Sequence, residues 1–293
     1  MNNFSHIPVL LKEAVDALQV EPGKKFIDAT LGGGGHTEEI IKRGGVVFGI
    51  DQDEDALEYV SQRLKDLIEN KKLVLGKGNF EEIRDLAQKN GFGNVDGVLF
   101  DLGVSSYQLD SSGRGFSIRH DEELDMRMDK SRELSALDVV NSYSESALID
   151  IFYRYGEEHN AKGIAQAIID KRKKEKIQTT KELAGLIERL PHKSEDIHPA
   201  TRVFQAIRIE VNQELKAIKQ GVYDSLSLVD AGGRIAVISF HSLEDRIVKQ
   251  TFEKARREGL GSLIVKKPIT STFEENVRNR RARSAKMRIF EKK

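Results

Sequence analysis

Residues 26–37 read FIDATLGGGGHT, and the next apolar run, residues 46–51, reads VVFGID. An apolar segment, a glycine turn, a polar segment and a second apolar segment are typical of strand, turn, helix and strand. Four consecutive glycines carry no Cβ, so the backbone can adopt positive φ and approach a ligand closely. The stretch therefore predicts an α/β fold whose glycine turn binds a nucleoside-bearing cofactor.

The spacing of the glycines narrows the choice of cofactor. A dinucleotide fingerprint requires Gly-x-Gly-x-x-Gly, but its third glycine position holds Thr37 or Glu38 here. A P-loop requires a lysine directly after its last glycine, whereas the first lysine after this turn is Lys42. Glu38 and Glu39 would also repel a pyrophosphate at the start of the helix. We therefore expect a cofactor without phosphate groups, namely S-adenosylmethionine.

Asp51, at the end of the second apolar run, is the expected ribose ligand. An acid at the tip of the second strand, about 20 residues beyond the glycine turn, can accept hydrogen bonds from ribose hydroxyls. The alternative interpretation is that residues 32–35 form a flexible turn and that Asp51 caps a helix over residues 53–64.

The other apolar runs predict how the chain is organised. Strands are expected at residues 25–28, 46–51, 73–76, 95–101 and 232–240, with helices at 9–18, 38–43, 53–70 and 80–90. Residues 111–210 contain no strand-like run, and we expect helices there at 134–155, 161–174 and 180–190. The prediction is a Rossmann-like, doubly wound and mostly parallel sheet built from residues 1–110 and 211–293, interrupted by an all-helical domain of residues 111–210.

Composition excludes several classes of protein. The 293 residues contain no Cys, which excludes disulfides, thiol nucleophiles and zinc–thiolate sites, and no cluster has metal-ligand spacing, so we predict no catalytic metal. No apolar run approaches the ~18 residues of a membrane span, and the amino terminus lacks the apolar core of a signal peptide. These features predict a soluble, cytoplasmic protein with no membrane contact.

The distribution of charge is more informative than its sum. Lys and Arg together number 47, as do Asp and Glu, so net charge gives no nucleic-acid signal. Residues 266–293, however, hold ten Lys or Arg against three acids, and a second basic cluster occupies residues 171–176. Such clusters can neutralise phosphates, although solvated helix faces give the same pattern. Arginine predominates in the tail, and its fork suits phosphate.

Asp101 is the candidate catalytic residue. It ends the fourth expected strand and precedes a polar loop, which places it at the carboxyl edge of the sheet beside the methyl group of a bound cofactor. A carboxylate there can accept hydrogen bonds from an exocyclic amino group and stabilise the charge that develops during methyl transfer. Two alternatives stay open, that Asp101 holds the cofactor or that it caps the following turn.

Seven blocks of sequence together resemble one known family. They are HIPVLL (6–11), DATLGGGGH (28–36), FDLGVSSYQLD (100–110), LDMRMD (124–129), FQAIRIEVN (204–212), ISFHSLEDR (238–246) and RARS (281–284). In this order they resemble the MraW family of bacterial 16S rRNA cytosine-N4 methyltransferases, and they extend over nearly the whole chain. The chain departs from the family at Gly33, where another residue is common, and at Arg280, where proline is usual.

The resemblance implies a class I methyltransferase that uses S-adenosylmethionine and methylates the N4 amino group of a cytidine in the decoding region of small-subunit rRNA. The residues that it implies for the cofactor are Gly34, Gly35, His36, Asp51, Phe80, Asp101 and Gln108. Without the resemblance, the sequence pattern already indicated the glycines and Asp51 as cofactor ligands. It did not indicate Phe80 or Gln108, which by themselves are typical of a packed aromatic and a polar loop group.

Arginines are the candidate substrate ligands. They are Arg114, Arg127, Arg202, Arg208, Arg281 and Arg283. Arg114, Gly115 and Phe116 together combine a charge, a flexible joint and a ring, which suit a phosphate and a splayed base. His241 is more typical of a loop histidine bonded to the backbone than of a catalytic base.

Two other functions remain open at this stage. A small-molecule methyltransferase would explain the cofactor turn but not the basic tail or the helical insert. A non-enzymatic rRNA-binding assembly factor would explain the fold without turnover. The absence of Cys argues against enzymes that methylate a ring carbon through a thiolate adduct. The expected partner is 16S rRNA, free or within the small ribosomal subunit, and the sequence leaves open whether the chain is a monomer or a homodimer.

Overall fold

The computed structural model describes residues 8–110, 113–191 and 197–293. His6 and Ile7 of the first resemblance block, and the first two residues of the expected insert, lie outside these ranges. The chain forms two compact units, one of Met1–Gly103 with Leu215–Lys293 and one of Val104–Glu214. The expected insert boundaries, residues 111 and 210, both fall within the second unit. No helix of the described ranges is long and apolar enough to span a bilayer.

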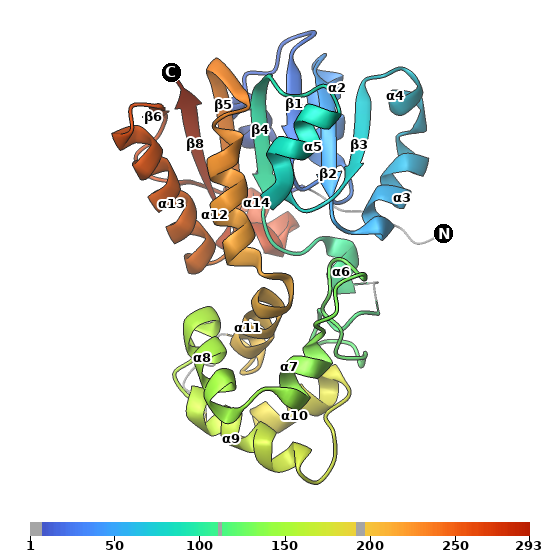
Figure 1. The fold of residues 1–293 in the computed structure, drawn as a ribbon, viewed down its shortest axis with the longest axis vertical. Helices are drawn as coiled ribbons and strands as arrows, with labels where there is room; N and C mark the ends of the chain where they lie inside the picture. Colours follow the sequence, from blue (N-terminus) through green and yellow to red (C-terminus); the bar gives the residue numbers. More distant parts are fainter. Residues whose placement is uncertain (1–7, 111–112, 192–196) are drawn as a thin grey trace. The chain divides into compact units, whose positions relative to one another are not determined.

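The first unit is built on one sheet with the strand order β3-β2-β1-β4-β5-β8-β6 (Figure 1). Its strands are β1 Lys25–Asp28, β2 Val46–Asp51, β3 Leu73–Lys77, β4 Val95–Asp101, β5 Val229–Ser239, β6 Gly261–Leu263, β7 Ile269–Thr270 and β8 Lys286–Lys292. Strands β1 to β5 are parallel, while β8 is antiparallel to β5, β6 and β7. The strand order reverses at β1, so the carboxyl ends of β1 and β4 flank the crevice in which such folds bind ligands. This confirms the predicted fold class.

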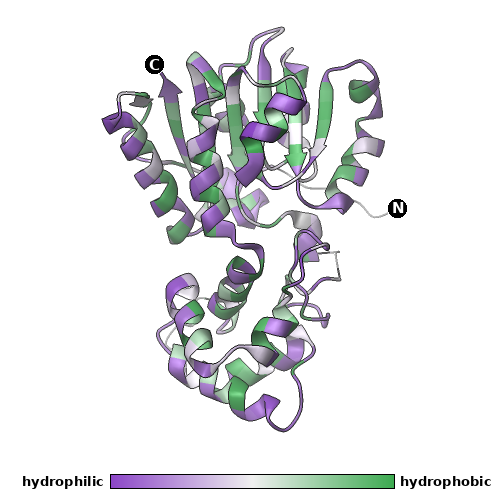
Figure 2. Cartoon of the chain, viewed as in Figure 1, coloured by the Kyte–Doolittle hydropathy of each residue, from purple (hydrophilic) through white to green (hydrophobic). Residues whose placement is uncertain are grey.

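Helices cover both faces of the sheet. One face packs against α5 Ile83–Lys89, α12 Glu214–Ser225 and α13 Ser242–Arg257, and the other packs against α1 Leu11–Ala17, α2 Gly35–Lys42 and α3 Glu54–Arg63. Phe48, Phe100 and Phe252 are fully buried in the first layer, and Phe26 is buried in the second. Apolar residues therefore concentrate along the strands, as Figure 2 shows. Burial on both faces explains why these strands appear in the sequence as short continuous apolar runs.

Strand β8 corrects the interpretation of the basic tail. Met287 and Phe290 are fully buried, and Arg288 is 8% exposed, with its guanidinium donating to both carboxylate oxygens of Asp245 at 2.7 and 3.0 Å. Arg288, which the sequence analysis counted in the basic tail, is therefore paired within the protein and not available to a phosphate. The remainder of the tail contains a helix, α14 Phe273–Arg278, and a 3₁₀ turn, η2 Arg280–Ser284.

The second unit is helical and has a core of its own. Its helices are α6 Ser106–Asp110, α7 Ala136–Ser142, α8 Glu145–Gly156, α9 Ala161–Arg172, α10 Thr180–Glu188 and α11 Thr201–Asn212. The single helix expected at 134–155 is two, because Tyr143 adopts extended backbone and Ser144 caps α8 by accepting from the Ala147 N–H. Likewise the helix expected at 53–70 breaks at Leu64 into α3 and α4 Lys65–Glu69.

Candidate functional site

The glycine turn after β1 has different physical requirements at Gly33, Gly34 and Gly35. Gly34 precedes α2 with a φ of 74°, and its N–H donates to the Leu31 carbonyl at 2.7 Å. A Cβ on Gly35 would lie 2.3 Å from Cγ of Pro8. A Cβ on Gly33 would meet no atom within 4 Å, and φ there is not positive. Glycine is therefore required for conformation at Gly34 and for packing at Gly35, and Gly33 is the position that can accept a side chain.

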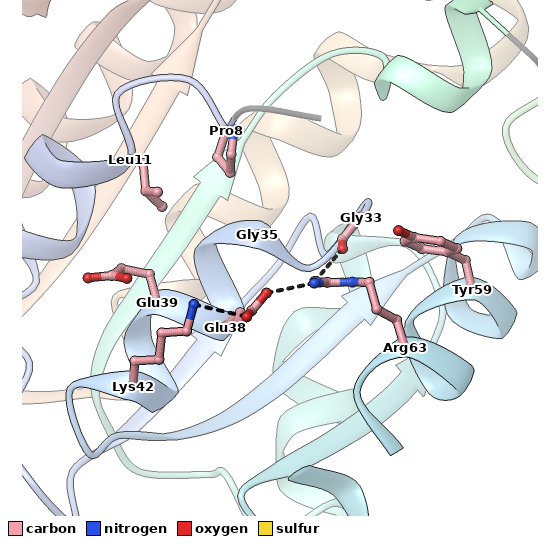
Figure 3. Close-up of a pocket in the computed structure, with 9 residues that line it drawn as sticks. All are labelled: Pro8, Leu11, Gly33, Gly35, Glu38, Glu39, Lys42, Tyr59 and Arg63. Carbon is pink, nitrogen blue, oxygen red and sulfur yellow. Dashed lines mark hydrogen bonds and ion pairs between the residues drawn. The ribbon is translucent and has the colours of Figure 1, made fainter. Parts of the chain in front are cut away.

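Arg63 of α3 holds the outer side of this turn. Its guanidinium donates to the Gly33 carbonyl at 2.9 Å and to Glu38 at 2.6 Å, and Lys42 lies 2.9 Å from the same carboxylate. Figure 3 shows these contacts in a cavity of about 190 Å³ that Tyr59 also lines. Ion pairs occupy one side of this cavity and Gly33 and Gly35 border it, so it lies on the α2 and α3 side of the turn rather than at the carboxyl end of β4.

Asp51, at the end of β2, is bonded to the turn itself. Its Oδ2 accepts from the Gly32 N–H at 2.8 Å, and its Oδ1 accepts from the Asp53 N–H at 2.9 Å. Burial raises the pKa of Asp51 to about 6, against the lowering effect of these hydrogen bonds. The cap of α3 is Asp53, which accepts from the Asp55 N–H, so the alternative that Asp51 caps this helix is wrong.

Asp28, at the end of β1, is a buried acid to which the sequence assigned no role. It is 1% exposed, and it accepts from the Thr37 hydroxyl at 2.7 Å and from the Thr30 N–H at 3.3 Å. Burial raises its pKa to about 6 in spite of these two donors. Thr30 in turn accepts from the Asp101 N–H at 2.6 Å, so the ends of β1 and β4 are joined.

Asp101, at the end of β4, has a buried Oδ1 with no hydrogen-bond partner in the described parts of the chain. Burial raises its pKa well above the ordinary value, as do the nearby charges of Asp28 and Glu244, and the positive charge of Arg281 partly offsets this. An unpartnered carboxylate oxygen in a buried position is costly, and it is a natural acceptor for a ligand N–H.

His36, in the first turn of α2, lies beside Asp101. Its Nε2 is 3.1 Å from the Val9 carbonyl, and its Nδ1 is 3.8 Å from Oδ2 of Asp101. Because a carbonyl can only accept, Nε2 carries the proton in this contact. The imidazole thereby links the segment before α1 to the catalytic candidate.

His241 and Glu244 form the cap of α13 next to this cluster. Nδ1 of His241 accepts from the Glu244 N–H at 3.4 Å, and the fully buried Glu244 accepts from the Phe240 N–H at 2.7 Å. The interpretation of His241 as a backbone-bonded loop histidine is confirmed. Glu244 was not singled out in the sequence, although His-x-x-Glu at a helix start resembles a capping box and could have indicated it.

Phe80 begins a 3₁₀ turn, η1 Phe80–Glu82, that follows β3. Its ring meets the edge of Phe100 at 5.7 Å between centroids, and its carbonyl would lie 2.5 Å from a Cβ on Gly221. Phe80 is therefore held by packing within the first unit at the carboxyl edge of the sheet. The structure gives a reason for its position, and its role beside adenine stays a prediction.

Gln108 has a local role in the second unit. Its Oε1 accepts from the Ser105 N–H at 3.0 Å while its own N–H donates to the Ser105 hydroxyl at 3.2 Å. This reciprocal arrangement is a capping box at the start of α6, and Gln108 is 5% exposed. The Ser-x-x-Gln spacing is a signal that sequence reasoning could have used.

Three of the six candidate substrate arginines are held by partners within the second unit. Arg114 is 5% exposed and donates to the carbonyls of Arg127 and Met128 at 3.1 and 3.3 Å. Arg127 binds both oxygens of Asp125 at 2.7 and 2.9 Å. Arg208 binds both oxygens of Glu214, each at 2.8 Å. Paired forks of this kind stabilise the unit and leave little for phosphate.

The expected joint and ring beside Arg114 are also structural. Phe116 is 6% exposed in the core of the second unit, so it cannot stack on a base as expected. A Cβ on Gly115 would lie 2.2 Å from the Glu123 carbonyl, which shows close packing rather than a flexible joint.

The other three arginines differ in exposure. Arg202 is half-buried and donates to the Glu157 carbonyl at 3.2 Å, and Arg283 is exposed. Arg281 belongs to the first unit, and its positive charge acts on Asp101. Of the candidates, Arg281 is therefore the one that the structure brings to the predicted catalytic group.

A doubly wound sheet with a glycine turn after β1, an acid after β2 and an unpartnered carboxylate after β4 defines a class I methyltransferase, which uses S-adenosylmethionine. The sequence profile of the MraW methylase family matches residues 3–293. The chain belongs to this family.

Curated relatives match along the whole chain. Proteins named ribosomal RNA small subunit methyltransferase H are 47% identical in Carboxydothermus hydrogenoformans, 44% in Fusobacterium nucleatum and 43% in Finegoldia magna. The alignments cover 99, 100 and 99% of this chain and 98, 98 and 99% of those proteins, respectively. The resemblance seen in the sequence blocks is confirmed.

Proposed function

We propose that this methyltransferase transfers a methyl group from S-adenosylmethionine to the N4 amino group of a cytidine in the decoding region of 16S rRNA. The relatives' names support small-subunit rRNA as the substrate, and the resemblance in sequence supports the cytosine amino group. The single observation that carries the chemistry is the buried Oδ1 of Asp101, an acceptor aimed at no described residue.

The residues at the carboxyl edge fit a phosphate-free cofactor. The Arg63 guanidinium donates to the Gly33 carbonyl and so holds the glycine turn. Glu38 lies in the first turn of α2, and its negative charge disfavours a pyrophosphate at this helix start. The proposed cofactor residues are Gly34, Gly35, His36, Asp51, Phe80, Asp101 and Gln108. Within this set Asp51 would bind the ribose hydroxyls, because its carboxylate lies at the tip of β2 and keeps lone pairs beyond its two backbone bonds.

Asp101 has a defined task in the reaction. The bound cofactor supplies an electrophilic methyl group. The cytosine amino nitrogen is a poor nucleophile because its lone pair is delocalised into the ring, and a hydrogen bond from its N–H to Oδ1 of Asp101 favours the pyramidal form. As the new nitrogen–carbon bond forms, the nitrogen loses one proton to Asp101. The raised pKa of Asp101 makes its ionised form a stronger proton acceptor than an ordinary carboxylate.

The two-part architecture fits a large substrate. We assign catalysis to residues 1–110 and 211–293 and recognition of the RNA to the helical insert of residues 111–210, as the sequence predicted. A target cytidine has to leave its stack to reach an atom that the duplex hides, and selecting one such site requires contacts beyond the base.

A labelling experiment tests this proposal. The protein is incubated with methyl-labelled S-adenosylmethionine and either purified 16S rRNA or small ribosomal subunits, and the RNA is digested to nucleosides. Label in N4-methylated cytidine is expected. Label at a ring carbon or in protein, or equal activity on free cytidine, would contradict the proposal. An Asp101→Ala variant that no longer methylates rRNA but keeps every effect of the protein in the cell would favour the assembly-factor alternative.

A further inference from the structure

Helix α14 exposes two large apolar side chains on one face. Phe273 is 78% exposed and Val277 is 68% exposed. Residues four positions apart in a helix lie next to each other, so the two side chains form one apolar patch. Phe273 is the most exposed large apolar residue among the described parts of the chain.

The exposure does not come from a loosely held helix. Thr272 caps α14 by accepting from the Glu275 N–H at 3.2 Å, and Glu275 accepts from the Leu10 N–H at 2.7 Å. The Ser271 hydroxyl donates to the carbonyl of Ala282 at 2.7 Å, and Ala282 is fully buried. The helix and the following turn η2 are therefore fixed on the first unit, and the Phe273 ring is presented to solvent by an ordered support.

Exposed basic side chains follow this apolar patch closely in the sequence. Arg278, Arg280, Arg283 and Lys286 are exposed, and none of them forms an ion pair with another described residue. The basic cluster at residues 171–176 differs, because Lys171 and Lys173 there are paired with Glu175 and Asp170. Three exposed arginines therefore lie within ten residues of an exposed ring in the sequence, and Glu274 contributes one negative charge on which Arg278 acts.

The same segment borders the reaction site. Arg281, between the exposed Arg280 and Arg283, acts on the pKa of Asp101 through its charge. Figure 1 shows α14 at the edge of the sheet where the parallel strands end. Nucleotides next to a base that reacts at Asp101 would therefore lie at the same edge of the first unit as this segment.

We propose that Phe273, Val277, Arg278, Arg280 and Arg283 form a platform for single-stranded RNA, on which Phe273 stacks an unpaired base while the arginines bind the flanking phosphates. An aromatic ring among arginines matches the way in which proteins bind unpaired nucleotides. A stable protein interface uses ~20–30 residues on each side, whereas this platform consists of five. The inference rests on the proposed RNA substrate and adds a second contact to it.

The sequence offers a direct reporter for this platform. It contains no Trp, so Phe273→Trp introduces a single indole at the proposed stacking position. We expect rRNA fragments that carry the target loop to quench its fluorescence. The matched control is Gln88→Trp, exposed on the last turn of α5 at the edge where the parallel strands begin, and its fluorescence should not change. Quenching that requires ribosomal proteins and fails with RNA alone would overturn the proposal.

Affinity measurements supply a second readout. Phe273→Ala should raise the Kd for the RNA fragment roughly tenfold, as expected for the loss of one stacked base, while Phe273→Tyr should bind like the wild type. The double variant Arg280→Gln with Arg283→Gln should reduce the slope of log K against log salt by about one to two. If these variants keep the affinity and the salt slope of the wild type, and the wild type methylates rRNA, the platform alone is refuted. A wild type that methylates no rRNA would refute the proposed function.

Discussion

Oδ2 of Asp51 accepts a hydrogen bond from the backbone N–H of Gly32 at 2.8 Å, which ties the tip of β2 to the turn after β1. The other oxygen accepts from the Asp53 N–H at 2.9 Å. A carboxylate held from two sides has little rotational freedom, so the proposed binding of a ribose would require little ordering of Asp51. Asp51 therefore positions the glycine turn.

Replacing Asp51 by Ala should weaken binding of S-adenosylmethionine by more than tenfold. The change removes the proposed ribose acceptor and leaves the N–H groups of Gly32 and Asp53 without their partner, so the turn is also less well ordered. Isothermal titration calorimetry measures the affinity, and Asp51→Asn, which keeps one carbonyl oxygen, should fall between the two. Equal affinity in wild type and Asp51→Ala would remove Asp51 from the cofactor site.

Asp101→Asn should separate the two roles considered for Asp101. The amide has nearly the same shape and keeps an acceptor, but it takes up no proton at neutral pH, so the rate of methyl transfer should fall by about 10²-fold or more. The Kd for S-adenosylmethionine should change much less. Single-turnover methylation and calorimetry give the two values. A large loss of cofactor affinity with a normal single-turnover rate would assign Asp101 to the cofactor alone.

Alanine substitutions at Gly33 and Gly35 should have opposite effects on stability. At Gly35 the new Cβ overlaps with Pro8, so the free energy of unfolding should fall by about 1–3 kcal/mol. At Gly33 no atom lies near the added Cβ and φ is not positive. Ala there should be neutral or stabilising by up to ~1 kcal/mol, because it lowers the conformational entropy of the unfolded chain. Urea unfolding of both variants checks this, and equal losses would contradict the described turn.

The buried carboxyl of Asp28 should make the protein less stable as pH rises from about 4 to about 6. Its pKa is about 6 in the folded state against 3.8 ordinarily, so the folded state binds the extra proton in that range. The contribution to the free energy of unfolding falls by up to ~3 kcal/mol and is constant above this window.

The Asp28→Asn variant isolates this contribution. Asn can still accept from the Thr30 N–H and can bond the Thr37 hydroxyl, but it does not titrate. The difference in unfolding free energy, variant minus wild type, should therefore increase between pH 4 and pH 6. A difference that stays flat across these pH values would show that Asp28 is not held as described.

The sequence predicted those parts of the site whose chemistry is local. The glycine turn, Asp51 and Asp101 each follow an apolar run, and parallel strands bring their ends to one edge whatever the rest of the chain does. The roles of Arg114 and Arg208 could not be predicted, because the sequence does not distinguish an arginine that binds a phosphate from one that binds a protein carbonyl. Their actual partners, Met128 and Glu214, depend on how the second unit folds.

The basic tail, residues 266–293, shows a second reason why part of the structure could not be predicted from the sequence. Residues 286–292 read KMRIFEK, and the charged residues dominated the interpretation although Met287 and Ile289 alternate with them as in a strand. The strand pairs with β5, which is about fifty residues earlier in the chain. Composition alone could not show that Arg288 faces Asp245, because the pairing depends on tertiary structure.

Strand β8 lies between β5 and β6 although it follows both of them in the sequence. During translation β5 therefore has an open edge, and Phe252 lacks its ring partner Phe290, 5.2 Å away in the folded protein. The sheet of the first unit is thus completed only after residues 286–292 have been synthesised, and until then an unpaired edge next to exposed apolar surface favours aggregation. Early termination within residues 286–292 should leave a chain dependent on chaperones, even though every proposed cofactor residue has already been made.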